Sequence, residues 1–158
     1  MGDHVTTRAV DDLLSTAGEW ASPPPPEVAA VLVNLLQLYA VYTDRGREAE
    51  LAALFTPDAT WDGTEMGFGV GEGPEAIAAT VLSHFDPAQP MMHVPGPPLL
   101  VAISDDVVRG VSWCIAARSS GDKAGLDPVI WFHYHDEFRR DDGAWRFRSR
   151  KLLLRFRG

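Results

Sequence analysis

Three side chains in this sequence place polar chemistry within apolar surroundings: Tyr39, Asp44 and His93. Tyr39 and Asp44 lie near the end of the apolar stretch 27–44, and His93 lies in the short apolar segment Met-Met-His-Val. An imidazole can remove a proton, and a phenol can donate a hydrogen bond to developing negative charge. Each residue also has a structural interpretation, because aspartates often end helices and buried histidines and tyrosines need hydrogen-bond partners. The residues by themselves leave both interpretations open.

A second candidate site is the pair His133 and His135, which share one face of a predicted strand with Trp131 and Glu137. Two histidines and a carboxylate can bind zinc or iron. A third ligand at suitable spacing is missing, so we predict no metal site. A register shift of one residue would nevertheless turn both histidines into the interior. The single cysteine, Cys114, cannot form an internal disulfide and is expected to be a small buried hydrophobe.

The stretch 27–44 predicts a helix around which the fold is organised. Its apolar side chains spread around most of a helix, as is typical of a core element. These residues are Val28, Val31, Leu32, Leu35, Leu36, Leu38, Tyr39 and Tyr42. Asp44-Arg45-Gly46 ends this helix, and a second helical stretch is expected to carry Leu51, Leu54 and Phe55 up to Pro57. A strand over 59–62 follows.

The order of the remaining elements along the chain indicates an α+β fold. The glycine-dense residues 63–73 lack a phosphate-binding motif and favour a bent or bulged strand pair. A further helix starts at Gly73-Pro74-Glu75. Strands are then predicted over 91–94, 99–103, 107–118, 129–140 and 144–156. Helices first and a curled antiparallel sheet afterwards predict a cone whose N-terminal helices close a central cavity.

Bulk properties limit the classes of function. The formal charge of −8 and a pI near 5.0 argue against electrostatic binding of nucleic acid or anionic membranes. The basic run 146–157 alternates with apolar residues, so it is expected to be a solvated strand face. No stretch approaches the roughly 20 apolar residues of a membrane span, and no signal peptide is evident, so we expect a cytoplasmic protein.

The N-terminal region is predicted to be separate from the main domain. Residues 1–25 form an appendage with a possible short helix over 8–20 and a proline-rich spacer, Ser22-Pro23-Pro24-Pro25-Pro26. Capping a pocket, crossing to a partner subunit and having no role all stay open for this segment. The domain itself spans residues 26–158.

Four segments together resemble the SnoaL-like branch of the nuclear-transport-factor-2-like, or cone, superfamily. They read LYAVYTDRGREAELAALFTPDATWD, GEGPEAIAATV, MMHV and YHDEFRRDDGAWRFRSR, and their order and spacing carry the resemblance. The superfamily includes dehydratases, dehydrochlorinases, isomerases and non-catalytic binding subunits. The resemblance therefore implies the cone fold more directly than it implies any one reaction.

The resemblance also implies how the candidate residues act together. Asp44 and His93 match the positions of an aspartate–histidine pair that meets inside the cone, and Tyr39 matches a pocket tyrosine. A carboxylate bonded to an imidazole fixes its tautomer and raises its basicity, so His93 could act as a base. The matched hairpin turns Tyr134 inward rather than the neighbouring histidines. The further residues expected to contact a substrate are Tyr134, Trp61, Phe55, Phe68, Arg118 and Ser112.

The resemblance breaks at several positions. Gly63 stands where some members carry a catalytic aspartate or tyrosine, and Ala116 and Arg118 supply no acid where another branch needs one. We therefore predict a cofactor-independent lyase or isomerase, of dehydratase type, acting on a small apolar, polycyclic or terpenoid-like metabolite. The alternative is a non-catalytic small-molecule-binding or accessory subunit with the same fold. Superfamily members commonly pair through their sheets, so a homodimer is also expected.

Overall fold

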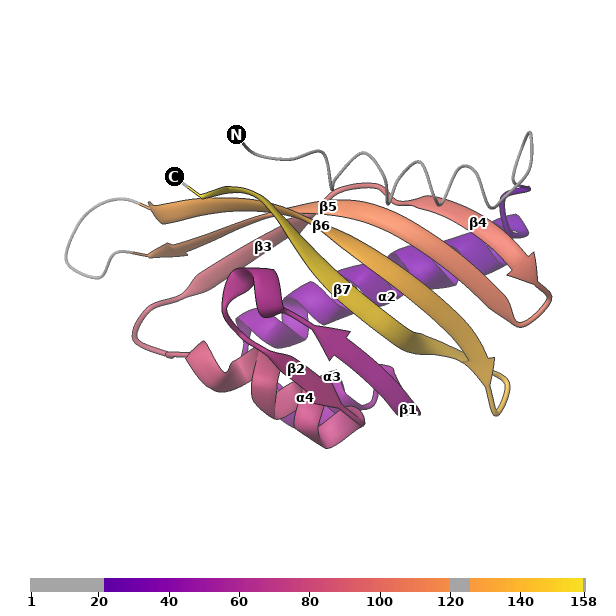
Figure 1. The fold of residues 1–158 in the computed structure, drawn as a ribbon, viewed down its shortest axis with the longest axis horizontal. Helices are drawn as coiled ribbons and strands as arrows, with labels where there is room; N and C mark the ends of the chain where they lie inside the picture. Colours follow the sequence, from indigo (N-terminus) through magenta and orange to yellow (C-terminus); the bar gives the residue numbers. More distant parts are fainter. Residues whose placement is uncertain (1–21, 120–125, 158) are drawn as a thin grey trace.

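The computed structural model describes residues 22–119 and 126–157, and Figure 1 shows its ribbon. The helix predicted over 8–20 and most of the predicted appendage lie outside the described residues. The helices are α2 (Pro26–Asp44), α3 (Glu48–Ala52) and α4 (Pro74–Val81), with 3₁₀ turns η2 (Thr64–Met66) and η3 (Leu82–His84). The strands are β1 (Phe55–Asp62), β2 (Val70–Glu72), β3 (Met91–Pro95), β4 (Leu99–Ser104), β5 (Val107–Ser119), β6 (Leu126–Asp141) and β7 (Ala144–Arg157).

The described strands form one curved sheet of seven strands. Its order is β2-β1-β7-β6-β5-β3, and β4 pairs with β5 as well. The β1–β7 pair is parallel and the other pairs are antiparallel. Strands β5, β6 and β7 arch over α2, which lies across their concave side (Figure 1). These features confirm the predicted α+β class with a curved, mixed sheet and N-terminal helices against it.

Helix α2 forms where the sequence predicts it, with one face in the core. Pro26 occupies its first turn, and its buried residues are Leu32, Leu35, Leu36, Tyr39, Ala40 and Thr43. Val31 was counted in the predicted apolar surface but is 46% exposed, because it lies to one side of this face. Among the described residues, α2 is long and apolar enough to cross a membrane, which corrects the sequence prediction that no stretch is. In this structure 33% of that apolar stretch is buried, on the face that packs beneath the sheet.

The connection after α2 depends on Gly46. Its φ of +61° lies in the left-handed region, and a Cβ at this position would stand 2.5 Å from the Phe85 ring. The second helix is shorter than predicted and ends at Ala52, so placing Leu54 and Phe55 in it was wrong. Phe55 instead starts β1, because it pairs with Phe147 of β7 and the Phe147 amide donates to the Leu54 carbonyl. An apolar run does not distinguish these two outcomes.

The three long strands lie within one or two residues of their predicted starts and ends, apart from the earlier start of β6. Along β6, Phe132, Tyr134, Asp136 and Phe138 are buried, whereas the residues between them face the other side of the sheet. The register shifts between Trp131 and Phe132 and again between Glu137 and Phe138. Such irregularities bend a strand, and here they help to curve β6 and β7 around α2.

A buried ion pair between Arg150 and Asp136 lies under α2. The guanidinium Nε and Nη2 donate to the two carboxylate oxygens of Asp136 at 2.8 Å each, and Arg150 is only 1% exposed. The guanidinium carbon lies 4.2, 3.8 and 4.2 Å from the ring centres of Tyr39, Tyr134 and Phe147. Burial alone would lower the pKa of Arg150, but the Asp136 carboxylate outweighs it and raises that pKa. The sequence prediction that the whole basic run is solvated is therefore wrong at Arg150.

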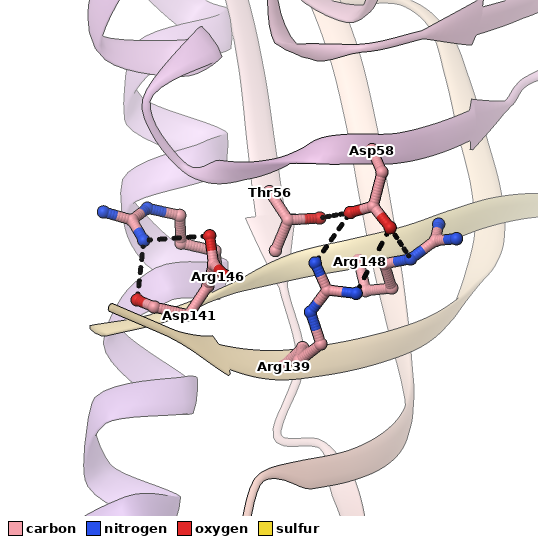
Figure 2. Close-up of polar contacts among 6 residues, drawn as sticks. All are labelled: Thr56, Asp58, Arg139, Asp141, Arg146 and Arg148. Atoms are coloured by element: carbon pink, nitrogen blue, oxygen red, sulfur yellow. Dashed lines mark hydrogen bonds and ion pairs between the residues drawn. The ribbon is translucent and has the colours of Figure 1, made fainter. Parts of the chain in front are cut away.

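Surface ion pairs join β1 to the β6–β7 hairpin (Figure 2). Asp58 accepts from Arg139 at 2.7 and 3.2 Å and lies 3.1 Å from Arg148, while Arg146 pairs with Asp141. The Arg139 guanidinium lowers the pKa of the Asp58 carboxyl group. Exposed pairs of this kind stabilise a fold by at most about 1 kcal/mol each. Packing of the core therefore supplies most of the stability of the contact between β1 and the hairpin.

Breaking the buried pair should destabilise the fold far more than breaking a surface pair. We expect Arg150→Met to reduce the free energy of unfolding by about 3–5 kcal/mol, because Asp136 would remain buried and unpaired. Urea unfolding followed by circular dichroism measures this change. The matched control is Arg148→Met, for which we expect a change of less than about 1 kcal/mol. The double variant Arg150→Met/Asp136→Leu should lose less than Arg150→Met alone; equal stability of Arg150→Met and wild type would contradict this account.

Candidate active site

A cavity of about 400 Å³ lies between α2 and the concave face of the sheet. This volume is within the range of sites that bind small organic molecules. Most of its wall is apolar, and the polar groups in it are few. Its lining residues are Tyr39, Thr43, Trp61, Met66, Gly67, Phe68, Val81, His84, Met91, His93, Ala116, Ala117, Arg118, Ile130, Phe132, Tyr134 and Leu152.

Asp44 and His93 meet at the wall of this cavity. The carboxylate Oδ1 lies 2.5 Å from the His93 Nδ1, and the backbone N–H of His93 donates to Oδ2 at 2.9 Å. The side chains are 19% and 11% exposed, respectively, so water has limited access to the pair. The contact forms because α2 ends at Asp44 directly beside β3. Both carboxylate oxygens are thus occupied by His93, and the imidazole is held at a fixed angle.

The Asp44 contact also determines which ring nitrogen of His93 can serve a ligand. A carboxylate only accepts hydrogen bonds, so His93 Nδ1 carries a proton in this contact. In the neutral ring Nε2 is then an acceptor with a free lone pair. His93 lines the cavity, and Phe132 approaches its ring edge-on with ring centres 6.4 Å apart. This arrangement is that of an oriented base in an apolar site.

Tyr39 lies on α2 one turn and a half before Asp44 and supplies a neutral hydrogen-bond donor. Its hydroxyl accepts a hydrogen bond from Trp61 Nε1 at 3.0 Å, so its own proton remains available. Burial raises the pKa of Tyr39 to about 12, although the Arg150 guanidinium beneath its ring acts in the opposite direction. Burial likewise raises the pKa of Tyr134 well above its ordinary value. Both phenols therefore stay protonated at neutral pH.

The structure brings together most, but not all, of the residues that the sequence suggested. Tyr39, Trp61, Phe68, His93, Arg118 and Tyr134 line the cavity. Asp44 is not part of the lining and stands behind His93. Arg118 donates to the backbone carbonyl of His84 at 3.0 Å, which holds its guanidinium at the cavity wall.

Phe55 and Ser112 were predicted to contact a substrate, and the structure places both outside the cavity lining. Phe55 packs against Phe147, with ring centres 5.3 Å apart, on the far side of Tyr39. Ser112 pairs in register with Tyr134 and is 3% exposed, but it is not among the residues that line the cavity. For Ser112 the predicted strand phase was right, but alternation alone does not give depth along a strand. Phe55 was predicted to lie in the second helix, so its place at the start of β1 was not expected.

The remaining candidate groups lie elsewhere. His133 and His135 face away from the cavity, and burial lowers the pKa of His135 to about 4. Cys114 is buried, and this burial raises the pKa of its thiol to about 12, as expected for an inert residue. Within residues 22–119 and 126–157, no group of three or more His, Cys, Asp or Glu side chains is placed to hold a metal ion.

Sequence reasoning missed Thr43 and His84, which also line the cavity. Thr43 follows Tyr39 by four residues and so lies on the same face of α2, a relation that the helical period could have revealed. His84 belongs to η3, and its ring packs against that of Phe68 at a tilt of 51°, with ring centres 4.9 Å apart. A 3₁₀ turn after a helix has no comparable sequence pattern, so this residue could not be assigned in advance.

Comparison with known proteins gives one family and many similar structures. The family described as SnoaL-like domain matches residues 28–151. No curated protein matches the chain. A putative scytalone dehydratase from Novosphingobium aromaticivorans is similar in structure, with a TM-score of 0.69, 19% identity, and coverage of 82% of this chain and 85% of that one.

Two other solved structures have related folds. The hexachlorocyclohexane dehydrochlorinase LinA-type3 of Novosphingobium barchaimii has a TM-score of 0.66 and 22% identity, over 95% of this chain and 92% of that one. The β subunit of a putative aromatic-ring-hydroxylating dioxygenase from Novosphingobium aromaticivorans has a TM-score of 0.68 and 16% identity, over 82% of this chain and 90% of that one. At these identities the likeness establishes a shared fold.

The Asp44 contact predicts the tautomer of His93. In the neutral ring we expect the proton on Nδ1, whereas free histidine favours Nε2, and long-range ¹H–¹⁵N correlation spectra of the imidazole report which nitrogen is protonated. Asp44→Ala should return His93 to the Nε2–H form, because the acceptor for Nδ1–H is gone. His84 in the same spectra serves as the internal control and should not change. A His93 ring that is protonated on Nε2 in the wild type would contradict the geometry.

Proposed function

Because the chain belongs to the family of SnoaL-like domains, we propose that it is a cofactor-independent lyase or isomerase acting on a small apolar ring compound. The observation that carries this proposal is the Asp44–His93 contact at 2.5 Å, with His93 on the wall of an apolar cavity. The fold shared with a dehydratase and a dehydrochlorinase supports a reaction that begins with removal of a proton from carbon. The cavity volume of about 400 Å³ suits a substrate of two or three rings.

In the proposed reaction His93 acts as both base and acid. Its Nε2 removes a proton from a carbon next to a carbonyl group, while Asp44 stabilises the resulting imidazolium. The electrons of that C–H bond form the new C=C bond as the neighbouring C–O bond breaks. The imidazolium then returns the proton to the departing hydroxide, which leaves as water, so the enzyme ends in its starting state. In an isomerisation the proton is returned to another carbon instead.

Tyr39 stabilises the negative charge that develops on the carbonyl oxygen. Its hydroxyl remains protonated, since burial raises its pKa to about 12, and Trp61 fixes its direction by donating to its oxygen. A fixed donor in a site with little water lowers the energy of an enolate-like transition state without reorganisation. Tyr134 touches Tyr39 edge-on, with ring centres 5.7 Å apart, and is a second donor in the same wall.

The second candidate function is a non-catalytic binding or accessory subunit. The observation that favours it is the wall formed by β5, which presents Ala116 and Ala117 where an additional acid could stand. The dioxygenase β subunit of similar fold is consistent with such a role. This alternative predicts that Asp44 and His93 are too far apart to interact, and the 2.5 Å contact weighs against it.

Turnover tests decide between these functions. Cyclic β-hydroxy ketones of one to three rings are incubated with the protein, and loss of water is followed by mass spectrometry. We expect His93→Gln to lower turnover by about 10²- to 10⁴-fold with an unchanged circular dichroism spectrum, because the base is lost and the fold is not. His135→Gln, on the other face of the sheet, is the control and should retain activity. Wild-type turnover by His93→Gln would refute the assignment, and saturable binding without turnover by the wild type would favour the accessory role.

We further propose that a second copy of the chain covers the outer face of the sheet. Val94, Ile115, Trp131 and Phe156 are aligned across β3, β5, β6 and β7, each paired in register with the next, and we term them the outer row. Their side chains are 43%, 38%, 46% and 55% exposed, respectively. A contiguous row of exposed apolar residues is unusual on the surface of a monomer. A twofold axis would pack this row against its own copy.

The dimer proposal predicts a change in mass when the outer row is charged. Ile115→Lys/Trp131→Lys should shift the sedimentation coefficient from that of a dimer to that of a monomer, because two buried cations would face their copies. Val41→Lys is the matched control, since Val41 is equally exposed at 43% but lies on α2. A monomeric wild type at micromolar concentration would refute the proposal.

A further inference from the structure

The hydroxyl of Thr43 is buried at the cavity and has no hydrogen-bond partner. Thr43 is 3% exposed, its Oγ1 is inaccessible to solvent, and the residue lines the cavity. Five buried side-chain polar atoms of the described residues lack a partner, and only that of Thr43 belongs to a residue of the cavity lining. Thr43 therefore lines a cavity large enough for a ligand and carries a hydroxyl that no protein group satisfies.

The local backbone does not satisfy this hydroxyl, although a helix offers a simple way to do so. A threonine within a helix commonly donates to the carbonyl four residues earlier. Thr80 of α4 does this, with its Oγ1 2.7 Å from the carbonyl oxygen of Ala76. Thr43 Oγ1 makes no such bond to Tyr39. A buried hydroxyl without a partner is costly, so its retention at this position needs a compensating contact.

Tyr39 and Thr43 lie on the same buried face of α2, and both line the cavity. They are four residues apart on α2, so their side chains are neighbours one turn apart on one face of the helix. The Tyr39 hydroxyl already accepts from Trp61, and its proton is free to be donated. The Thr43 hydroxyl can both donate and accept. His93 contributes the third polar group of this region, next to Asp44 at the end of the same helix.

We propose that Thr43 is a ligand-binding residue, which with Tyr39 binds an oxygen atom of an otherwise apolar ring compound. The ligand oxygen is a hydroxyl or a carbonyl group, and the rings lie against the aromatic and methionine side chains of the cavity wall. Thr43 thereby makes the cavity select oxygenated rings over hydrocarbons of the same shape. This inference rests on the proposed function for the location of the site, but it concerns binding and does not require turnover.

Two aromatic probes of matched shape test the selection. The affinities of 2-naphthol and 2-methylnaphthalene are measured by fluorescence titration for the wild type, Thr43→Val and Thr43→Ser. We expect the wild type to prefer 2-naphthol, Thr43→Val to lose about 3- to 10-fold in 2-naphthol affinity, and Thr43→Ser to lose no more than about twofold. The affinity for 2-methylnaphthalene should be unchanged or higher in Thr43→Val. Thr80→Val removes a helical hydroxyl away from the cavity and should leave both affinities unchanged.

The thermal stability of the unliganded variants is a second readout. Since valine has the shape of threonine without the unpaired hydroxyl, Thr43→Val should have a melting temperature equal to or higher than that of the wild type. A lower melting temperature would mean that the hydroxyl is satisfied within the fold, and the proposal would fail. It would fail equally if the wild type showed no preference for 2-naphthol or if Thr43→Val retained that preference. If His93→Gln kept wild-type turnover, the lyase assignment would fail, but these binding results would still stand.

Discussion

The two hydrogen bonds between Asp44 and His93 determine how the first half of the chain meets the second. They join the last residue of α2 to β3, 49 residues further along, through both the ring and the backbone of His93. A contact to the ring alone would allow the strand to slide or the imidazole to rotate. With the backbone amide bound as well, the position of β3 and the angle of the imidazole are set by one carboxylate. The cavity takes its shape from where this contact holds α2 against the sheet.

A second charged group supports the same cavity from below. The Arg150–Asp136 pair is fully buried, and its guanidinium lies against the rings of Tyr39, Tyr134 and Phe147. A buried ion pair of this kind gains little net stability over an apolar replacement, but losing one partner is costly. Its flat guanidinium also restricts the tilt of both tyrosine rings that stand above it. The rigidity of the phenols in the cavity thus depends on a pair of charges that lies outside the cavity lining.

The sequence predicted the architecture better than it predicted the site. Apolar periodicity located α2 and the long strands, and the family resemblance turned Tyr134 inward and His133 outward, as the structure has them. The Asp44–His93 contact was foreseen only from family resemblance, because no local pattern relates two residues 49 positions apart. Arg150 was misassigned, since a buried arginine in an alternating basic strand has the same pattern as a solvated one. Ser112 was misplaced because strand alternation gives the side of a sheet and not the depth within it, and Phe55 was misplaced because its apolar run was assigned to a helix.

The base and its nearest hydrogen-bonding groups come from two elements of the fold, and this arrangement has consequences for specificity. Tyr39 and Thr43 lie on the last turns of α2, Asp44 ends it, and His93 lies in the middle of β3. The apolar wall of the cavity includes Met66, which ends the short turn η2, and Phe68, which follows it by two residues. Short turns contribute less to the core than α2 does, so substitutions there can alter the shape of the wall at low cost to stability. Changes of ligand shape can therefore occur without disturbing the contact between Asp44 and His93.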